Sequence, residues 1–329
     1  MKKLNVAIIT GGNVAERGIS LKSAQTVHKH LPKDRYRSFV LDLEGRDFTE
    51  LASGEKIDKN DFSLQLGGEI IHFDLAFLML HGHPAEDGCL QGYLDIIGIP
   101  YTGCDHFVSS LTFNKQACKD FLHRHNIPMA SSMLLHKGDP IDWVGLNTLG
   151  LPLFVKPNKN GSSYGISKVT ESTAIAAAID LAFQYDDEII VEAFIKGQEF
   201  SNGVLRKDGD IIVMPITEIV SKNDFFDYKA KYLSESEEIT PARLSDDMRR
   251  RCQAQSKKLY QALGCMGMTR FDYILKDETF YFLEANTIPG MSEASIFPQQ
   301  AIAHGWTISE MLEAIVEEAL SKVESPSQT

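Results

Sequence analysis

Short apolar runs and longer amphipathic stretches alternate along the first hundred residues. Three runs predict strands, and the continuously apolar first and third are typical of parallel strands buried on both faces: Leu4 to Thr10, Ser38 to Leu43 and Leu75 to Leu80. Helical patterns follow the first and third runs, from about Ala15 to His30 and from Cys89 to Ile97. This alternation predicts a doubly wound α/β domain over residues 1–105.

The pattern changes after residue 105. Leu111 to His125 reads as one amphipathic helix. Further strands are predicted at Leu153 to Pro157, Ile166 to Val169, Glu188 to Ile195 and Ile211 to Met214. We expect Pro215 to mark the end of the last of these strands or an edge position. Ser245 to Leu263 is predicted as a helix that ends before Gly264, and a capping box at Thr307-x-x-Glu310 predicts a last helix to about Val323.

A β-hairpin is predicted near the carboxyl end of the chain. Residues Arg270 to Tyr273 alternate between polar and apolar, Thr279 to Asn286 is mostly apolar, and the polar Lys276-Asp277-Glu278 lies between them. A turn there sets Asp272 roughly opposite Glu284, and side chains two apart share a face.

The hairpin carries candidate metal ligands. Two carboxylates that face each other across a ladder repel, so we expect a positive charge between Asp272 and Glu284. With the amide of Asn286 they form an all-oxygen donor set, which suits Mg²⁺. The loop Pro289 to Ser292 follows and could offer backbone N–H groups to an anion. The alternative is an ordinary surface hairpin with solvated acids.

Two further segments are candidates for binding phosphate and nucleotide. Asn158 to Gly165 is rich in glycine and serine and follows Lys156, so it could grip phosphate oxygens, although it lacks the GxxxxGK[ST] pattern and could be a plain hairpin loop. Glu192 and Glu199 flank a strand end and could bind an adenine amino group and ribose hydroxyls, together with the backbone of Ala193 to Ile195. Acids that border strands are common, so this second signal is weak alone.

The loop after Leu80 begins with His81 and lies between a strand end and a helix start, where α/β sheets bind small ligands. His81 is therefore a candidate substrate residue. His81 and His83 could instead bind zinc with Cys89, but no second close pair completes four ligands.

Composition restricts the choice of partners. A chain of 329 residues predicts two or three domains, and a net charge of −12 argues against a nucleic-acid or membrane partner. Five scattered cysteines without a CxxC pair predict reduced thiols in a cytoplasmic protein. No signal peptide is expected, and no run approaches the roughly 20 apolar residues of a membrane helix. Residues 325–329 are expected to be disordered.

Eight segments taken together resemble the bacterial D-alanine–D-alanine ligase family of the ATP-grasp superfamily. They are GGNVAERGISL, LHGHPAEDGCLQG, YTG, LPLFVKPNKNGSSYGISKV, VEAFIKGQEF, FFDYKAKYL, TRFDYIL and FYFLEANTIPGMSEASIFPQ. The resemblance implies a three-domain ATP-grasp architecture of mixed α/β and α+β class. Its parts would be an N-terminal α/β domain (1–105), a central domain (106–195) and a C-terminal catalytic domain (196–324).

The same resemblance implies roles for individual residues. Those that would bind ATP are Lys115, Lys156, Ser163 and Lys231 at the phosphates, and Glu192, Ala193, Phe194, Ile195 and Glu199 at adenine and ribose. Those that would bind two D-alanines are Glu16 and His81 for the first and Ser295 and Ile296 for the second. Arg270 and the Gly290 N–H would stabilise the oxyanion. Asp272, Glu284 and Asn286 would ligate two Mg²⁺ ions, with Mn²⁺ as an alternative.

The implied reaction forms D-alanyl-D-alanine for peptidoglycan synthesis through a D-alanyl phosphate. Glu16, Ser162 and Tyr232 match a trio that ties a lid over the site, and Tyr232 disfavours D-lactate as the acceptor, whereas D-Ser stays an alternative. The chain differs from the usual pattern at Asn114, Tyr164 and Ala193. A homodimer is expected. Two other classes stay open: a non-catalytic nucleotide-binding regulator, which would have lost a metal ligand, and a dehydrogenase, for which Gly11-Gly12 without GxGxxG is weak evidence.

Overall fold

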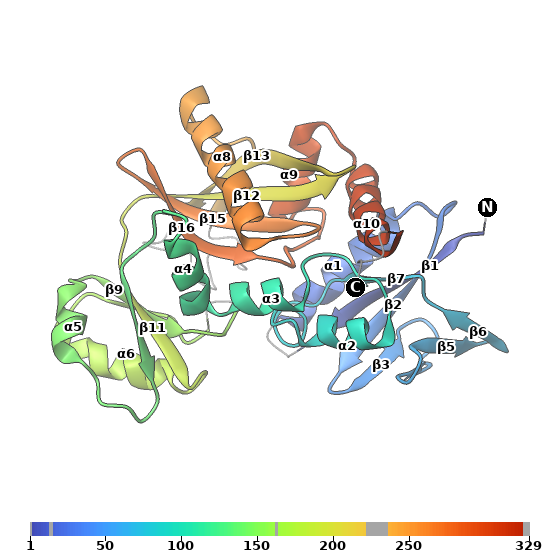
Figure 1. Cartoon of the computed structure of the whole chain (residues 1–329), viewed down its shortest axis with the longest axis horizontal. Helices are drawn as coiled ribbons and strands as arrows, with labels where there is room; N and C mark the ends of the chain where they lie inside the picture. Colours follow the sequence, from blue (N-terminus) through green and yellow to red (C-terminus); the bar gives the residue numbers. More distant parts are fainter. Residues whose placement is uncertain (1, 13–15, 162–163, 222–235, 325–329) are drawn as a thin grey trace.

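The computed structural model of the chain describes residues 2–12, 16–161, 164–221 and 236–324 (Figure 1). Four of the predicted site residues lie outside the described residues: Ser162, Ser163, Lys231 and Tyr232. The tail 325–329 lies outside them as well. Helices and sheets are mixed throughout, as the α/β prediction requires.

The N-terminal sheet has the strand order β3-β2-β1-β7. Its strands are β1 (Leu4–Gly11), β2 (Tyr36–Glu44), β3 (Asp47–Glu50) and β7 (Leu75–Leu78). The strands β2, β1 and β7 are parallel, and β3 adds an antiparallel edge. Two helices follow the parallel strands: α1 (Arg17–His30) after β1 and α2 (Cys89–Ile97) after β7. The apolar runs therefore identified the buried strands and their helices correctly.

The sequence pattern missed the strands between β2 and β7. Besides β3, a small antiparallel sheet forms from β4 (Ile57–Asp58), β5 (Ser63–Leu66) and β6 (Glu69–His72). Each has four residues or fewer and is partly exposed, so none carries a long enough alternation to be recognised.

The predicted helix over Leu111 to His125 is wrong: two helices occupy this region, α3 (His106–Phe113) and α4 (Lys115–His123). Asn114 separates them in an extended conformation and caps α4, because its side-chain oxygen accepts a hydrogen bond from Ala117 N at 2.9 Å. The amphipathic period runs through this break, so the pattern alone did not show it.

The central sheet is antiparallel, with the order β10-β9-β11-β8. Its strands are β8 (Ser132–His136), β9 (Leu153–Pro157), β10 (Ser167–Val169) and β11 (Glu188–Ala193). The helices of this region are α5 (Trp143–Thr148), the 3-10 helix η1 (Ser172–Ala174) and α6 (Ile175–Ala182). The sheet and α6 enclose a separate apolar core that includes Val155, Ile179 and Val191.

The C-terminal sheet is also antiparallel, with the order β14-β13-β12-β15-β16. Its strands are β12 (Gln198–Lys207), β13 (Asp210–Ser221), β14 (Ser236–Ile239), β15 (Thr269–Lys276) and β16 (Thr279–Asn286). Three helices accompany it: α8 (Asp246–Leu263), α9 (Ile296–His304) and α10 (Ile308–Glu324). The helix α10 also packs against the core of the N-terminal sheet (Figure 1). The predicted domain boundaries at 105 and 195 stay predictions.

Of the two predicted alternatives for Pro215, the strand end is wrong and the edge position agrees with the structure. Pro215 lies inside β13, where the pairing with β12 shifts register between Asn202 and Val204. The partner strand β14 pairs only with the later part of β13, from Glu218 onward. Pro215 therefore removes no required ladder hydrogen bond at this irregularity.

The β15–β16 hairpin closes with a turn that is unusual in composition. Asp277 and Glu278 have φ angles of 47° and 59°, and two positive values are typical of a type I′ turn. The β12–β13 hairpin uses Asp208 (φ 51°) and Gly209 (φ 85°) instead. Residues with a side chain disfavour positive φ, so the second position of such a turn is better occupied by a glycine, as at Gly209, than by Glu278.

We predict that Glu278→Gly raises the free energy of unfolding by roughly 1 kcal/mol, because glycine removes the cost of a left-handed residue. The reverse change in the matched hairpin, Gly209→Glu, should lower it by a similar amount. Urea denaturation of both variants measures the effect. A destabilised Glu278→Gly variant would contradict the strain argument.

Candidate functional site

One cavity of about 1530 Å³ gathers every predicted site residue that the structure describes. These residues are Glu16, His81, Lys115, Lys156, Glu192, Ala193, Phe194, Ile195, Glu199, Arg270, Asp272, Glu284, Asn286, Gly290, Ser295 and Ile296. They come from the central and C-terminal sheets, from helices, and from the loop after β7, so residues more than 250 positions apart line the same space.

The β15–β16 hairpin supplies one wall of this cavity. Asp272 pairs with Glu284 and Arg270 with Asn286, which is the predicted register. The guanidinium of Arg270 donates to both carboxylate oxygens of Asp272, from Nε at 3.0 Å and from Nη2 at 2.8 Å. Ser201 Oγ, from the adjacent β12, donates to Asp272 Oδ1 at 2.6 Å. Both Arg270 and Asp272 are buried.

This geometry corrects the argument for a cation between Asp272 and Glu284. Arg270 already neutralises Asp272, so repulsion between the two acids does not by itself demand a metal ion. Burial alone would lower the pKa of Arg270, but the charges of Asp272 and Glu284 outweigh burial and raise it. Arg270 is therefore a fixed positive charge on the cavity wall.

The donor set still fits a hard cation. Glu284 is partly buried and faces the cavity opposite Asp272, whose two oxygens have lone pairs beyond those that Arg270 and Ser201 use. The Asn286 amide satisfies both of its ends when its oxygen accepts from Arg270 Nη2 at 3.0 Å and its nitrogen donates to Glu86 Oε1 at 3.2 Å. Two carboxylates and an amide oxygen on one wall could hold Mg²⁺.

A buried cluster of charges borders another part of the cavity. Glu192 on β11 accepts from Lys119 Nζ at 2.5 Å and pairs with Lys156. Lys119 Nζ also donates to Ala130 O at 2.8 Å. Burial alone would raise the pKa of Glu192, but the charges of Lys156 and Lys119 and their hydrogen bonds outweigh it and lower the pKa to about 2. Glu192 therefore stays ionised and holds both lysines in place.

Lys119 was missed from the sequence. It lies four residues after Lys115 on α4, a spacing that places both side chains on one helix face and could have revealed it. Burial lowers the pKa of Lys115, while the nearby Glu284 opposes that shift. Lys115, Lys119 and Lys156 thus concentrate positive charge in an acidic protein, where an anionic ligand would be favoured.

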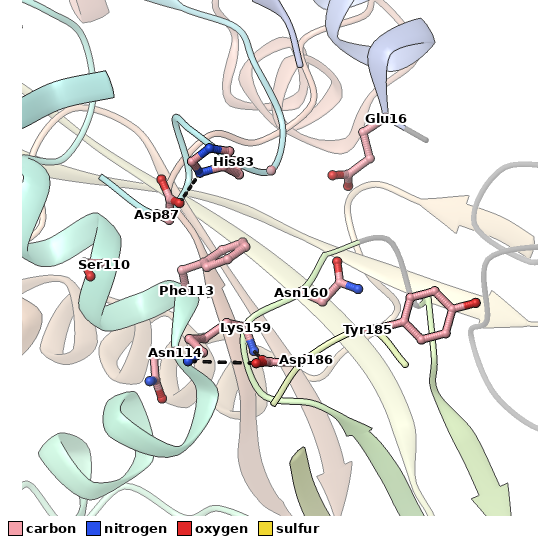
Figure 2. A pocket seen from close by; sticks show the side chains of 11 residues that line it. Glu16, His83, Asp87, Ser110, Phe113, Asn114, Lys159, Asn160, Tyr185 and Asp186 are labelled. Carbon is pink, nitrogen blue, oxygen red and sulfur yellow. Dashed lines mark hydrogen bonds and ion pairs between the residues drawn. The ribbon is translucent and has the colours of Figure 1, made fainter. Parts of the chain in front are cut away.

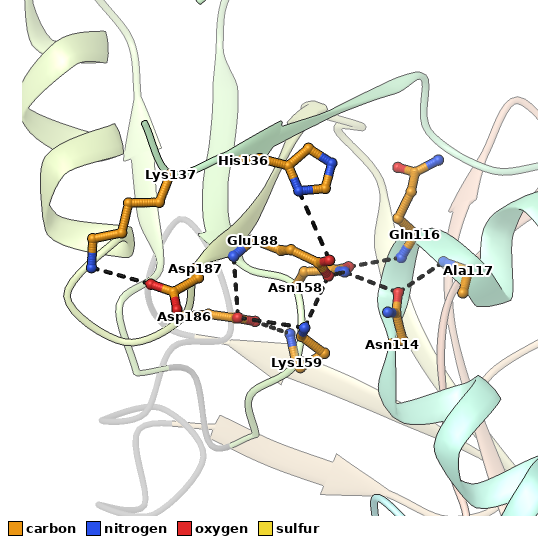
Figure 3. A network of polar contacts seen from close by, with 10 residues as sticks. All are labelled: Asn114, Gln116, Ala117, His136, Lys137, Asn158, Lys159, Asp186, Asp187 and Glu188. Carbon is orange, nitrogen blue, oxygen red and sulfur yellow. Dashed lines mark hydrogen bonds and ion pairs between the residues drawn. The ribbon is translucent and has the colours of Figure 1, made fainter. Parts of the chain in front are cut away.

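Asn158, the first residue of the predicted phosphate-binding segment, joins the elements that carry these lysines (Figure 3). It is fully buried, and its Nδ2 donates to Asn114 Oδ1 at 2.9 Å and to Glu188 Oε2 at 3.0 Å. Its Oδ1 accepts from Gln116 N at 2.9 Å, and its carbonyl accepts from Lys115 N at 3.1 Å. Asn158 therefore fixes the start of α4 against β9 and β11, so Lys115 and Lys156 keep their relative positions.

One face of α1 connects two loops that border the cavity. Glu16 lies at its N-cap position. Ser20 Oγ accepts from His81 N at 3.0 Å, and Ser23 Oγ accepts from Met291 N at 3.0 Å. Ser20 lies four residues after Glu16, and Ser23 lies three residues after Ser20, so the three side chains share one helix face. The helix thereby places the His81 loop and the Gly290 loop on the same cavity.

His81 lines the cavity and has a buried ring nitrogen without a hydrogen-bond partner among the described residues. The side chain is buried, its Nδ1 lies 3.7 Å from Glu86 Oε1, and no described residue hydrogen-bonds its Nε2. A buried polar atom without a partner is costly, and a bound ligand would remove that cost. This observation supports a substrate-binding role for His81.

The start of α9 forms a third part of the cavity. Ser295 is the N-cap residue, its Oγ lies 2.7 Å from Ser292 Oγ, and Ile296 begins the helix. Gly290 lies so close that a β-carbon there would be 3.1 Å from Ser295 Oγ. Backbone N–H groups at a helix start favour a carboxylate or phosphate.

Comparisons with known proteins agree with this arrangement. The family model described as D-ala D-ala ligase N-terminus matches residues 5–104, and the one described as D-ala D-ala ligase C-terminus matches residues 129–317. The D-alanine–D-alanine ligase of Phocaeicola vulgatus is 44% identical over 320 residues, which are 96% of this chain and 99% of that protein. The D-alanine–D-alanine ligase of Flavobacterium psychrophilum is 45% identical over 322 residues, with 97% and 98% covered.

Solved structures give the same fold. The VanG D-Ala:D-Ser ligase from Enterococcus faecalis superposes with a TM-score of 0.87 at 31% identity, over 97% of this chain and all of that one. The D-alanine–D-alanine ligase from Bacillus anthracis in complex with ATP gives 0.80 at 28% identity, over 98% of this chain and all of that one.

The fold and the matched structures define an ATP-grasp enzyme of the ligase class. Within that class, the chain belongs to the D-alanine–D-alanine ligase family. Among the described residues, no helix is both long enough and apolar enough to cross a membrane.

We predict that Lys119→Met lowers the free energy of unfolding by roughly 1–3 kcal/mol, because the buried carboxylate of Glu192 loses a partner. It should also raise the KM for ATP, since Glu192 and Lys156 lose the side chain that helps to hold them in place. The matched control is Lys257→Met on the exposed face of α8. Denaturation and initial-rate kinetics test both variants, and equal behaviour of the two would contradict the role of Lys119.

Proposed function

We propose that the chain joins two molecules of D-alanine to form D-alanyl-D-alanine, with ATP converted to ADP and phosphate. The observation that carries this proposal is the shared cavity: Lys115 and Lys156, the Arg270–Asp272 pair and the Glu16–His81 region line one space. Such an arrangement would bring a triphosphate, a carboxylate and an amine together.

The reaction divides into two displacements. The carboxylate of the first D-alanine attacks the γ-phosphate of ATP, and ADP leaves to give D-alanyl phosphate. The amine of the second D-alanine then attacks the acyl carbon, and phosphate leaves. Both the carboxylate and the triphosphate are anions, so positive charge in the site must offset their repulsion.

Residues on the lysine-rich wall would bind ATP. Lys115 and Lys156 would contact the phosphates, and Lys119 would hold Glu192 and Lys156 in place. The strand end with Glu192, Ala193, Phe194 and Ile195, together with Glu199, would bind adenine and ribose. Ser163 and Lys231, expected at the phosphates, are outside the described residues.

Residues on the other walls would bind the amino acids. Glu16 and His81 would hold the first D-alanine, and Ser295 with Ile296 at the start of α9 would hold the carboxylate of the second. Arg270 and the N–H of Gly290 would stabilise the negative charge on the tetrahedral oxygen. The lid trio of Glu16, Ser162 and Tyr232 rests on the family resemblance, and only Glu16 of the three is described.

Asp272, Glu284 and Asn286 would hold two Mg²⁺ ions, with Mn²⁺ as the alternative. When bound, the ions would neutralise phosphate charge. The enzyme would act as a homodimer in the cytoplasm and supply peptidoglycan synthesis. The absence of disulfides among the five cysteines is compatible with that compartment.

The second candidate function uses D-serine as the acceptor, because the structure of a D-Ala:D-Ser ligase superposes on this chain with a TM-score of 0.87. Phosphate release distinguishes the two candidates. ATP and Mg²⁺ are supplied with D-alanine alone, with D-alanine plus D-serine, or with D-alanine plus D-lactate. The product of each reaction is identified by its mass. We expect rapid release with D-alanine alone. If no acceptor leads to phosphate release, the ligase proposal is refuted. If phosphate is released only when D-serine is present, D-serine and not D-alanine is the acceptor.

We predict that Glu284→Ala lowers kcat roughly 100- to 1,000-fold, as loss of other groups that stabilise transition-state charge does. The exposed Asp277→Ala at the tip of the same hairpin is the matched control and should keep full activity. Steady-state phosphate release at saturating Mg²⁺ checks this. Wild-type kcat in Glu284→Ala would exclude Glu284 as a metal ligand.

A further inference from the structure

Three side chains with metal-binding atoms meet at the start of α2, outside the cavity described above. His83 and Asp87 lie on the loop between β7 and α2, and Cys89 is the first residue of the helix. One ligating atom from each lies within 4.8 Å of the other two. His83 Nδ1 is 2.5 Å from Asp87 Oδ2, so a carboxylate already joins the imidazole.

The cluster is accessible. Figure 2 shows His83 and Asp87 side by side on one side of a cavity of about 330 Å³, with Glu16 approaching from α1. The side chain of His83 is 70% exposed. Cys89 is the exposed cysteine of the chain, because the other four are buried. A cation from solvent could therefore reach all three ligands without any unfolding.

Asp87 orients both of its neighbours. Its Oδ2 contacts the His83 ring, and its Oδ1 accepts from Cys89 N at 3.2 Å. With one ligating atom from each of the three side chains within 4.8 Å of the other two, a single dication could contact all three groups.

The sequence pattern had suggested a different ligand set, with His81 beside His83 and Cys89. His81 is instead buried and lines the large cavity, where Ser20 bonds its backbone. The third side chain of the cluster is therefore Asp87 and not His81. Loop geometry therefore separates a ligand-facing histidine from a surface-facing histidine only two residues away.

We propose that His83, Asp87 and Cys89 bind one divalent cation of the zinc class. One imidazole, one carboxylate and one thiolate match the ligands that Zn²⁺ takes, and three protein ligands leave the fourth tetrahedral position to water. Mg²⁺ and Ca²⁺ prefer oxygen, so a thiolate discriminates against them. Binding releases the thiol proton of Cys89. The site uses no residue of the nucleotide cavity, so it stands independently of the ligase reaction.

The test uses the full-length protein without nucleotide and with excess Mg²⁺, which keeps the carboxylates of Asp272 and Glu284 from binding the probe. A chromogenic disulfide should react quickly with one thiol in the folded protein, and one equivalent of Zn²⁺ should protect that thiol. Titration calorimetry should give one Zn²⁺ per chain. Co²⁺ should produce a thiolate-to-cobalt charge-transfer band.

Ligand variants distinguish a built site from simple thiol chemistry. His83→Gln, Asp87→Asn and Cys89→Ser should each weaken Zn²⁺ binding by roughly 100-fold, the upper end of what loss of even an outer-shell partner costs. The control is His106→Gln, an exposed histidine that pairs with Asp95 on the adjacent surface. Thermal denaturation verifies that each variant is folded.

Two outcomes would overturn the proposal. If His83→Gln binds Zn²⁺ with wild-type affinity while Cys89→Ser loses binding, the thiol alone binds the metal. Unprotected Cys89 at one equivalent of Zn²⁺ would mean that no site exists at these residues. Loss of binding in all three variants, with binding retained in His106→Gln, would support it.

Discussion

The pairing register of β15 and β16 is the constraint on which the rest of the site depends. It places Asp272 opposite Glu284 and Arg270 opposite Asn286, and a shift by one residue would turn all four side chains to the other face of the sheet. A two-residue turn and an irregularity after Asp272 fix this register at its two ends. The adjacent strand β12 then adds a hydrogen bond from Ser201 to Asp272.

Charge on the two walls of the cavity is arranged differently, and this difference suits a ligand with several negative groups. On the hairpin wall, a bidentate pair leaves Arg270 and Asp272 neutral as a unit, with Glu284 beside them. On the wall formed by β9, β11 and α4, Lys156 shares the carboxylate of Glu192 with Lys119, and Lys115 lies near them. Positive charge therefore exceeds negative charge there, although the whole chain carries −12. Buried hydrogen bonds through Asn158 keep this arrangement rigid without a ligand.

The sequence predicted the local elements of this site well because their signals are local. Continuous apolar runs identified β1 and β7, and the alternation around Asp277 identified the hairpin and its register. Signals failed where tertiary contacts override local pattern. The break at Asn114 depends on Asn158, a residue 44 positions later. The strand β13 continues through Pro215 because the pairing with β12 shifts register there and β14 joins only from Glu218 onward.

The sequence by itself determined which chemical groups this enzyme of the D-alanine–D-alanine ligase family has and which short elements carry them, since strand and helix periods are read from neighbouring residues. Only the tertiary structure decided which groups share a space. It placed His81 in the large cavity and His83 on the surface beside Asp87 and Cys89. It also revealed Lys119 as a partner of Glu192, 73 residues away. Burial and pairing between distant segments depend on how the sheets pack, and no single stretch of residues encodes that packing.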